Sequence, residues 1–397
     1  MNKKKVLITG ASIAGNTVAF WLSRQNFDVT VVERAESFRT GGQNVDIRGA
    51  GRIVLQRMGL EKKAIELTTG ELGTDWVDEK DNVIARFAVD DIGDGPTAEL
   101  EIMRGDISEI IFEESRKYAK YRFGEHIIAV SQHADGSSVT FNNHQSEYYD
   151  IIVVAEGVGS STRNLLFTNE YRMRYMDLTI AYFAIPGKES DGKFSRQYNT
   201  VGGRGATLKP GSDGKLRVYM GIHKVSESEQ KWSVEKQKEF LKEKFAKDGW
   251  EFPRILTELD GIDDFYFDVM RQVKMDKWSK KNLVLAGDAA WCATPLSGIG
   301  TTLAIVGGYV LAGEIAKNDD PEKAFQAYEQ IMRPFVDEGQ GLPKIVPRLL
   351  WPHSRMGLLF LRFVMRIAGT KPVRKVFSKL YLRNSEKIEL PLYKLEI

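Results

Sequence analysis

Residues 10 to 15, Gly-Ala-Ser-Ile-Ala-Gly, have the types and the spacing that a phosphate-binding turn requires. They follow a short β-rich segment, residues 5 to 9, and precede a segment whose apolar residues have helical spacing. Gly10 would allow a tight turn, Ser12 is small enough for the backbone to approach a pyrophosphate, and Gly15 would let the helix pack closely on the strand. The run predicts a strand, a phosphate-binding turn and a helix at the beginning of the chain.

An acidic residue follows about 20 positions later, where a dinucleotide site needs one. Glu33 ends the next predicted strand, residues 28 to 33, and its carboxylate can accept hydrogen bonds from a ribose diol. The N-terminus of the helix would offer free N–H groups and a positive dipole end to the phosphates. Because an acidic residue disfavours a 2′-phosphate, FAD or NAD is favoured over NADP here. The alternative is a glycine turn that serves only the fold.

A second group of residues lies far along the chain, after an apolar strand predicted at residues 282 to 286. Gly287 and Asp288 follow this strand, and Pro295, Gly298 and Gly300 lie at the entrance of a long predicted helix. With the N-terminal turn, this pattern resembles the single-component FAD-dependent aromatic monooxygenases, which have the p-hydroxybenzoate hydroxylase fold. The segments 39 to 48 and 264 to 275 are most similar to the tetracycline destructases of that family. The resemblance covers about residues 4 to 340.

The resemblance implies FAD as the cofactor and NADPH or NADH as a transient reductant. In the family the Gly-Asp pair holds the ribityl chain, the Pro-x-x-Gly-x-Gly loop lies beside the isoalloxazine, and the position of Arg39 is linked to NADPH. The cofactor-binding residues that it implies are Gly10, Ser12, Ile13, Ala14, Gly15, Glu33, Arg34, Arg39, Asp46, Arg104, Gly157, Asp288, Pro295, Gly298, Gly300 and Thr301.

The sequence departs from the family pattern at four positions. Glu156 stands where the family has Asp, Ile299 and Thr302 replace a Gln and an Asn, and Trp291 replaces a frequent His. We expect flavin binding to persist, because the loop acts largely through its backbone. Cys292, in the same loop, is expected to be a packed small hydrophobic residue with no catalytic role.

The resemblance also implies a reaction. Reduced FAD would react with O2, and a C4a-hydroperoxide would hydroxylate an aromatic or enolic small molecule, with polyketides such as the tetracyclines among the candidates. No side chain is expected to be catalytic, because the flavin carries the chemistry. Two alternatives stay open: a flavin-dependent reductase or oxidase of a hydrophobic substrate, and a non-catalytic flavoprotein that binds a hydrophobic ligand. The residues predicted to contact the substrate are Gln197, Tyr198, Arg204 and Phe267.

These elements predict an α/β fold, in which a Rossmann-type FAD-binding domain is interleaved with a mixed-sheet substrate domain and followed by a C-terminal helical segment. The FAD-binding domain is expected in three parts, residues 1–72, 101–168 and 277–340. The substrate domain is expected to comprise a hairpin at 73–100 and residues 169–276, and the C-terminal helices residues 341–397.

Composition excludes several other classes of protein. The 56 Lys and Arg balance 54 Asp and Glu, so a nucleic-acid partner is not expected. One cysteine and five scattered histidines indicate neither a disulfide framework nor a metal site, and we expect a cytoplasmic monomer or homodimer. The apolar segment Met356 to Arg366, followed by the cations Lys371, Arg374, Lys375 and Lys379, is expected to dock on the substrate domain. A membrane partner is not expected.

Overall fold

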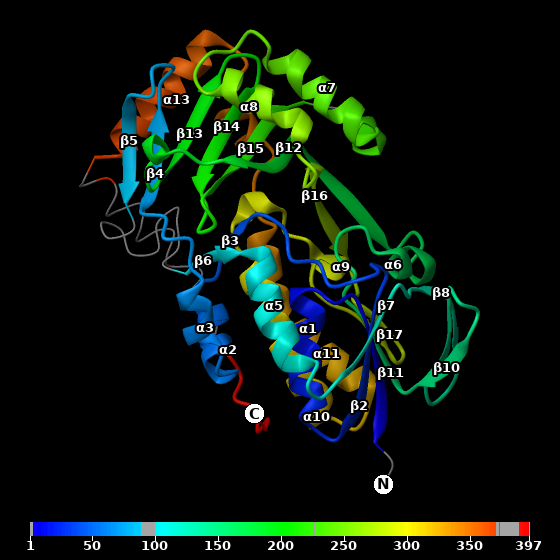
Figure 1. Ribbon diagram of the computed structural model, residues 1–397. Coiled ribbons are helices and arrows are strands. Elements are labelled where there is room, and N and C mark those ends of the chain that lie inside the picture. The colour runs from blue at the N-terminus through cyan, green and yellow to red at the C-terminus, as the bar shows by residue number, and fades with distance from the viewer. Residues whose placement is uncertain (1–2, 89–99, 225–226, 371–372, 374–388, 397) are drawn as a thin grey trace.

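A mostly parallel sheet lies at the centre of one half of the molecule (Figure 1). The computed structural model describes residues 3–88, 100–224, 227–370, 373 and 389–396. In this part of the chain the strand order is β17–β18–β11–β1–β2–β7, and only β17 is antiparallel to its neighbour. The bounds are β1 Lys4–Thr9, β2 Phe27–Glu33, β7 Lys120–Phe123, β11 Ile151–Val154, β17 Ser279–Lys280 and β18 Leu283–Leu285.

Layers on both sides bury the middle of this sheet, which explains why its inner strands β1, β11 and β18 contain continuous apolar runs rather than alternating ones. Helices lie on one side, and the small antiparallel sheet β8–β9–β10 lies on the other (Figure 1). Every residue of α1 is buried, since α1 packs between α5, α10 and the sheet. The bounds are α1 Ile13–Ser23, α5 Arg104–Ser115, α10 Gly300–Lys317, α11 Pro321–Gly339, β8 Ile127–Gln132, β9 Ser137–Phe141 and β10 Ser146–Tyr149.

A larger sheet forms the other half of the molecule, in the order β16–β12–β15–β14–β13–β4–β5. It is antiparallel except for the pair β13 and β4, and the side chains alternate between its two faces. Helices α7 and α8 cover one face, and the other face turns toward the parallel sheet (Figure 1). The bounds are β4 Gly73–Val77, β5 Val83–Ala88, β12 Tyr171–Pro186, β13 Phe194–Thr200, β14 Arg204–Pro210, β15 Lys215–His223, β16 Tyr266–Met275, α7 Val234–Phe245 and α8 Phe252–Glu258.

Short elements connect the two halves. The two-stranded sheet of β3 and β6 lies between them, and β6 leads directly into α5 (Figure 1). The bounds are β3 Asn44–Asp46, β6 Glu101–Met103, α2 Ala50–Arg57, α3 Glu61–Glu66, α6 Ser161–Leu166, α9 Asp288–Trp291, α12 Ile345–Leu350 and α13 Arg355–Ala368. The interleaved α/β architecture predicted from the sequence is confirmed, and its division into six numbered segments remains a proposal.

The described C-terminal segments contact both halves of the molecule. Helix α13 packs on β5, and residues 389–396 return to α10, where the Tyr393 hydroxyl donates a hydrogen bond to Glu314. Most of the predicted basic segment, including Lys371, Arg374, Lys375 and Lys379, lies outside the described residues. None of the helices in the described ranges is both long and apolar enough to cross a bilayer.

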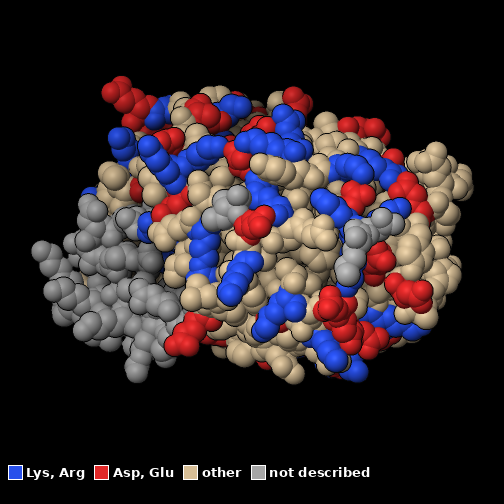
Figure 2. Space-filling view, turned by 90° about the horizontal axis from the view of Figure 1, so that it is seen from below, with Lys and Arg blue, Asp and Glu red and all other residues tan. Residues whose placement is uncertain are grey.

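Charges of both signs are mixed over the face seen in Figure 2, in keeping with the small net charge. Lys and Arg side chains lie beside Asp and Glu side chains there. Oppositely charged side chains of the described residues also pair closely, as Lys63 does with Glu114 at 2.8 Å. On that face the described residues form no broad surface of one sign.

Candidate active site

A cavity of about 420 Å³ opens at the carboxyl ends of β1, β2 and β11, between the two halves of the molecule. Its volume is in the range of small-molecule sites. Of the sixteen residues that the sequence assigned to the cofactor, all but Gly15 line it: Gly10, Ser12, Ile13, Ala14, Glu33, Arg34, Arg39, Asp46, Arg104, Gly157, Asp288, Pro295, Gly298, Gly300 and Thr301. The fold therefore brings together segments that lie almost 300 residues apart.

The turn before α1 requires its two glycines for steric reasons. Gly10 has φ +104, and a Cβ there would lie 2.4 Å from the carbonyl oxygen of Ala155. A Cβ on Gly15 would lie 2.0 Å from the carbonyl oxygen of Gly10, so Gly15 serves the packing of helix on strand rather than the cavity. The first turn of α1 contains no acidic residue and no side chain caps it. Its free N–H groups can therefore donate hydrogen bonds to an anion.

The acidic partner of this turn is held in place by the backbone. The carboxylate of Glu33 accepts hydrogen bonds from the N–H groups of Ala11 and Ala35, each at 3.0 Å. These two bonds fix the carboxylate at the end of β2, at the edge of the cavity, where a ribose would be within its reach.

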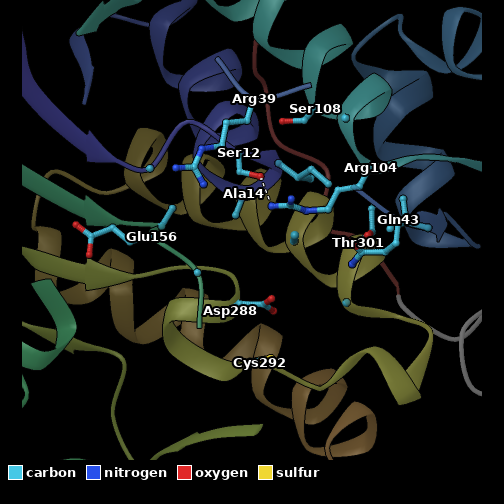
Figure 3. Close-up of a pocket in the computed structure, with 18 of the residues that line it drawn as sticks. Ser12, Ala14, Arg39, Gln43, Arg104, Ser108, Glu156, Asp288, Cys292 and Thr301 are labelled. Atoms are coloured by element: carbon cyan, nitrogen blue, oxygen red, sulfur yellow. Dashed lines mark hydrogen bonds between the residues drawn. The ribbon is translucent and has the colours of Figure 1, made fainter. Parts of the chain in front are cut away.

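Arg104 and Asp288 enter the cavity from opposite sides (Figure 3). Arg104 begins α5, and its guanidinium donates a hydrogen bond to the Ser12 hydroxyl at 2.9 Å. Asp288 begins α9, directly after Gly287, and its side chain is open to the cavity although protein surrounds it on the other sides. Burial raises the pKa of Asp288, and the charge of Arg104 partly opposes this shift.

The loop from Pro295 to Gly300 directs the N-terminus of α10 at the cavity. Pro295–Ser297 form a single 3-10 turn, and Gly298 follows with a left-handed φ of +68. Helix α10 has 18 residues, no side-chain cap and no acidic residue in its first turn, so its positive end is not neutralised. This end can stabilise negative charge that develops on a bound group.

Polar residues lie at the end of the cavity nearest the large sheet, and of these the sequence singled out only Asp46. Among the described residues, neither the amide oxygen nor the amide nitrogen of the Asn44 side chain has a hydrogen-bond partner, although both atoms are buried. Beside it, Asp46 pairs with Arg48 at 3.0 Å, and Lys209 pairs with Glu101. Burial raises the pKa of Asp46 against the opposing charge of Arg48. No local pattern could reveal Asn44 or Lys209, since β3, β6 and β14 converge only in the fold.

The departures from the family pattern have structural roles here. The carboxylate of Glu156 accepts hydrogen bonds from the hydroxyls of Thr9 and Thr162, both at 2.6 Å, and from the Thr162 N–H at 2.9 Å. Burial opposes ionisation of Glu156, but these hydrogen bonds outweigh it and lower the pKa. Thr302 accepts a hydrogen bond from the Arg48 N–H at 3.1 Å, and Ile299 packs in the main core.

Two neighbouring residues of the same loop are also packed. The Trp291 indole is buried and donates a hydrogen bond to the Tyr328 hydroxyl at 3.2 Å. Cys292 is 5% exposed, and burial raises the pKa of its thiol well above the ordinary value. A thiol in this state is a poor nucleophile, as expected from the sequence.

These features fit an FAD molecule. Two uncapped helix N-termini would face its phosphates and its ring, and the open carboxylate of Asp288 would accept hydrogen bonds from ribityl hydroxyls. The buried amide of Asn44 lacks a partner that the polar edge of a flavin would supply. In the described part of the chain no cluster of three or more His, Cys, Asp or Glu could hold a metal ion.

A row of mainly aromatic side chains crosses the large sheet on the face toward this cavity. The strand register places Tyr266, Tyr182, Tyr219, Thr207, Gln197 and Trp76 side by side on six neighbouring strands. The hydroxyl of Tyr219 accepts a hydrogen bond from the Asn44 N–H at 2.9 Å, which joins the row to the cavity wall. The Tyr182 and Tyr219 rings pack edge to face with centroids 4.9 Å apart.

Of the four predicted substrate residues, only Gln197 belongs to this row. Tyr198 and Phe267 point to the opposite face, where they are buried in the core under α7 and α8. Arg204 pairs with Asp248, which follows α7, at 3.0 Å. The alternation of side chains along β13, β14 and β16 causes this separation, and it argues against a substrate role for these three residues. Tyr219 and Trp76, which were not predicted from the sequence, lie in the row on the face toward the cavity, where substrate residues were expected.

Comparisons with known proteins agree with this geometry. A family model described as FAD binding domain matches residues 3–338. Monooxygenase CTB7 of Cercospora beticola is 34% identical over 99% of this chain and 98% of its own. The FAD-dependent monooxygenase asL6 of Sarocladium schorii is 32% identical, with 98% of each chain covered.

The solved structures include a similar fold over the full length. The tetracycline destructase Tet(55) has a TM-score of 0.83 and 29% identity, with 99% of each chain covered. The tetracycline destructase Tet(51) has a TM-score of 0.79 and 27% identity. The resemblance drawn from the sequence is confirmed, as is FAD as the cofactor: this chain belongs to the FAD-dependent monooxygenases, a family of oxidoreductases.

Proposed function

We propose that this monooxygenase uses NADPH or NADH and O2 to hydroxylate a polycyclic phenol or enol, such as a polyketide of the tetracycline type. The observation that carries this proposal is the aromatic row on the large sheet, which the Tyr219–Asn44 hydrogen bond attaches to the cofactor cavity. Stacked and edge-on aromatic contacts favour a flat, fused-ring substrate. The similarity to Tet(55) supports the same class of substrate.

The cofactor, when bound, supplies hydride acceptance and oxygen activation. The residues of the chain then have three tasks on the substrate: they bind and orient it, stabilise negative charge beside it, and exclude water from it. Tyr266, Tyr182 and Tyr219 would bind the rings of the substrate, while Thr207 and Gln197 would orient its polar groups. The N-terminus of α10 would stabilise negative charge in the cavity. Arg39, which lines the cavity, is our candidate for contact with a nicotinamide cofactor.

Exclusion of water is the third task, because water in the site favours release of hydrogen peroxide over hydroxylation. An apolar cluster next to the tyrosines, with Ile180, Met270, Leu296 and Trp351, provides the dry wall. Trp351 fits this wall because Gly221 lacks a side chain: a Cβ there would lie 2.5 Å from the indole nitrogen.

The test is product analysis by mass spectrometry after incubation of the holoenzyme with NADPH, ¹⁸O2 and a panel of tetracyclines and simple phenols. We expect substrate-stimulated NADPH oxidation and one labelled oxygen atom in a polycyclic product. NADPH oxidation without incorporated label would indicate a reductase or oxidase instead. Incorporation only into single-ring phenols would contradict the proposed substrate class.

The cellular setting is also a proposal. The single cysteine is a buried thiol, which suits a reducing compartment, and we propose that the enzyme acts in the cytoplasm. We propose a monomer or homodimer, which light scattering of the purified protein would distinguish.

A further inference from the structure

Helices α12 and α13 carry an exposed apolar surface that the proposed reaction does not use. Met356 is 82% exposed, and Phe360 and Phe363 are 63% and 60% exposed. Their exposed apolar neighbours are Ile345, Leu349, Leu359, Val364 and Ile367. Large side chains exposed together in this way mark an interaction site rather than an ordinary surface.

Helical spacing divides α13 into three lengthwise stripes. Leu361, Met365 and Ala368 form the inward stripe, in which Met365 and Ala368 pack with Ala85 and Phe87 of β5. A second stripe, Met356, Phe360, Phe363 and Ile367, recurs every three to four residues and faces outward. Arg355, Arg362 and Arg366 form a third stripe between the other two. The helix thus docks on the substrate domain, as expected, and still presents an apolar face.

Contacts of α13 and of the residues before it fix the orientation of the helix. The N–H groups of Gly202 and Gly203 donate hydrogen bonds to the carbonyl oxygens of His353 and Pro352, both at 3.0 Å. Trp351 is buried against Gly221, and Arg362 pairs with Glu79 at 2.9 Å. The apolar stripe is therefore held outward by the fold.

The charges of this region have one sign. Residues 341 to 370 contain five Lys and Arg and no Asp or Glu. A cationic stripe beside an apolar stripe is the arrangement of helices that lie in the headgroup region of a membrane. The 14 residues of α13 extend about 21 Å, shorter than the bilayer core, so the helix would lie in the plane.

A second copy of the chain fits this surface less well. A symmetric dimer brings each patch against itself, so the arginine stripes of the two copies would approach each other. Glu79 pairs with Arg362, but neither α12 nor α13 has an acidic residue to neutralise Arg355 and Arg366. Anionic lipid headgroups supply the missing negative charge.

We propose that α12 and α13 form a docking surface for an anionic lipid membrane, into whose headgroup region the stripe Met356, Phe360, Phe363 and Ile367 inserts. Arg355, Arg366, Lys344 and Arg348, all exposed, contact the lipid phosphates. Such docking would bring the active site close to a phase where apolar polycyclic compounds accumulate. The surface itself does not depend on the identity of the substrate.

The experiment is flotation of the full-length holoprotein with vesicles of phosphatidylcholine, alone or with about one third phosphatidylglycerol. We expect flotation with the anionic vesicles that falls as salt is raised. The double variant Phe360→Ser/Phe363→Ser should bind at least about tenfold more weakly, because it loses two inserted rings. Arg355→Glu/Arg366→Glu should lose the preference for anionic lipid.

The matched control is Ile65→Ser/Leu165→Ser, which removes two side chains, each 46% exposed, from α3 and α6. It should float like the wild type. Absence of flotation for the wild type, or unchanged flotation of the phenylalanine variant, would overturn the proposal. Equal binding to neutral vesicles would also overturn it. So would a wild-type dimer that the phenylalanine variant converts to a monomer, since the surface would then serve self-association.

Discussion

The guanidinium of Arg104 donates a hydrogen bond to the hydroxyl of Ser12, and this bond joins the first residue of α5 to the turn before α1. The two residues are 92 positions apart in the chain. The Ser12 hydroxyl does not cap α1, so the N–H groups at the start of α1 stay available to phosphate. The same bond places a positive charge beside those N–H groups. We therefore expect Arg104 to act on the cofactor together with the helix dipole.

Replacing Arg104 with Ala should weaken FAD binding about tenfold, because a hydrogen bond from a charged donor contributes roughly 1.5 kcal/mol or more. Fluorescence titration of the apoprotein with FAD measures this change. Arg116→Ala is the matched control, since Arg116 follows the same helix and is 55% exposed. Equal affinities of the wild type and Arg104→Ala would remove Arg104 from the cofactor site.

Asp288→Asn should lower FAD affinity about ten- to a hundredfold, since it replaces a charged acceptor deep in the cavity. Burial raises the pKa of Asp288, so its carboxyl is protonated at a higher pH than an ordinary aspartate. FAD affinity of the wild type should therefore fall as the pH is lowered through this range. The FAD affinity of the Asp288→Asn variant should not change over this pH range. Asp276→Asn, at a side chain that is 97% exposed, should behave like the wild type.

The cofactor side of the fold could be predicted from the sequence because local patterns determine it. Gly10 and Gly15 are required by contacts within one strand–turn–helix unit, and Glu33 ends the next strand. Asp288 and Gly298 likewise lie in short turns next to predicted elements. Parallel strands bring all such turns to one edge of the sheet, so the cavity follows from the topology.

The substrate side could not be predicted in the same way. Gln197 and Tyr198 are neighbours on β13, and alternation requires only that they point to opposite faces. Which face meets the cofactor depends on the pairing of β13 with β14 and of β14 with β15, which is a long-range property. Asn44 and Lys209 were missed for the same reason. Register and packing, rather than composition, select these residues.

Lys209→Met should destabilise the folded protein by about 3 kcal/mol, because removing one partner leaves buried charge without its counter-ion. The Lys209 ammonium binds Glu101 and lies 3.2 Å from Glu71, and both carboxylates are almost fully buried. Urea unfolding measures the effect, and a second change, Glu101→Gln, should restore part of the stability. Lys242→Met, at an exposed pair, should cost less than about 1 kcal/mol. If Lys209→Met and Lys242→Met lowered the free energy of unfolding by similar amounts, burial would not explain the effect at Lys209.

The lowered pKa of Glu114 predicts how the free energy of unfolding depends on pH. Its carboxylate accepts hydrogen bonds from Lys117 at 2.6 Å and Lys63 at 2.8 Å, and these bonds lower its pKa from 4.5 to about 2. A carboxyl group with a lowered pKa stabilises the folded state fully above the unfolded value and loses this contribution as the pH falls toward the folded value. Both lysines are more than half exposed, so screening reduces the contribution to about 1 kcal/mol.

Glu114→Gln should therefore unfold at lower urea than the wild type at neutral pH, and the difference should shrink as the pH falls from 4.5 toward about 2. Unfolding curves at several pH values in this window measure the trend. Glu113→Gln provides the control, because Glu113 has a single exposed partner in Arg116 and lies on the same helix. If the difference in stability between the wild type and Glu114→Gln stayed constant down to about pH 2, packing rather than ionisation would explain the effect of Glu114.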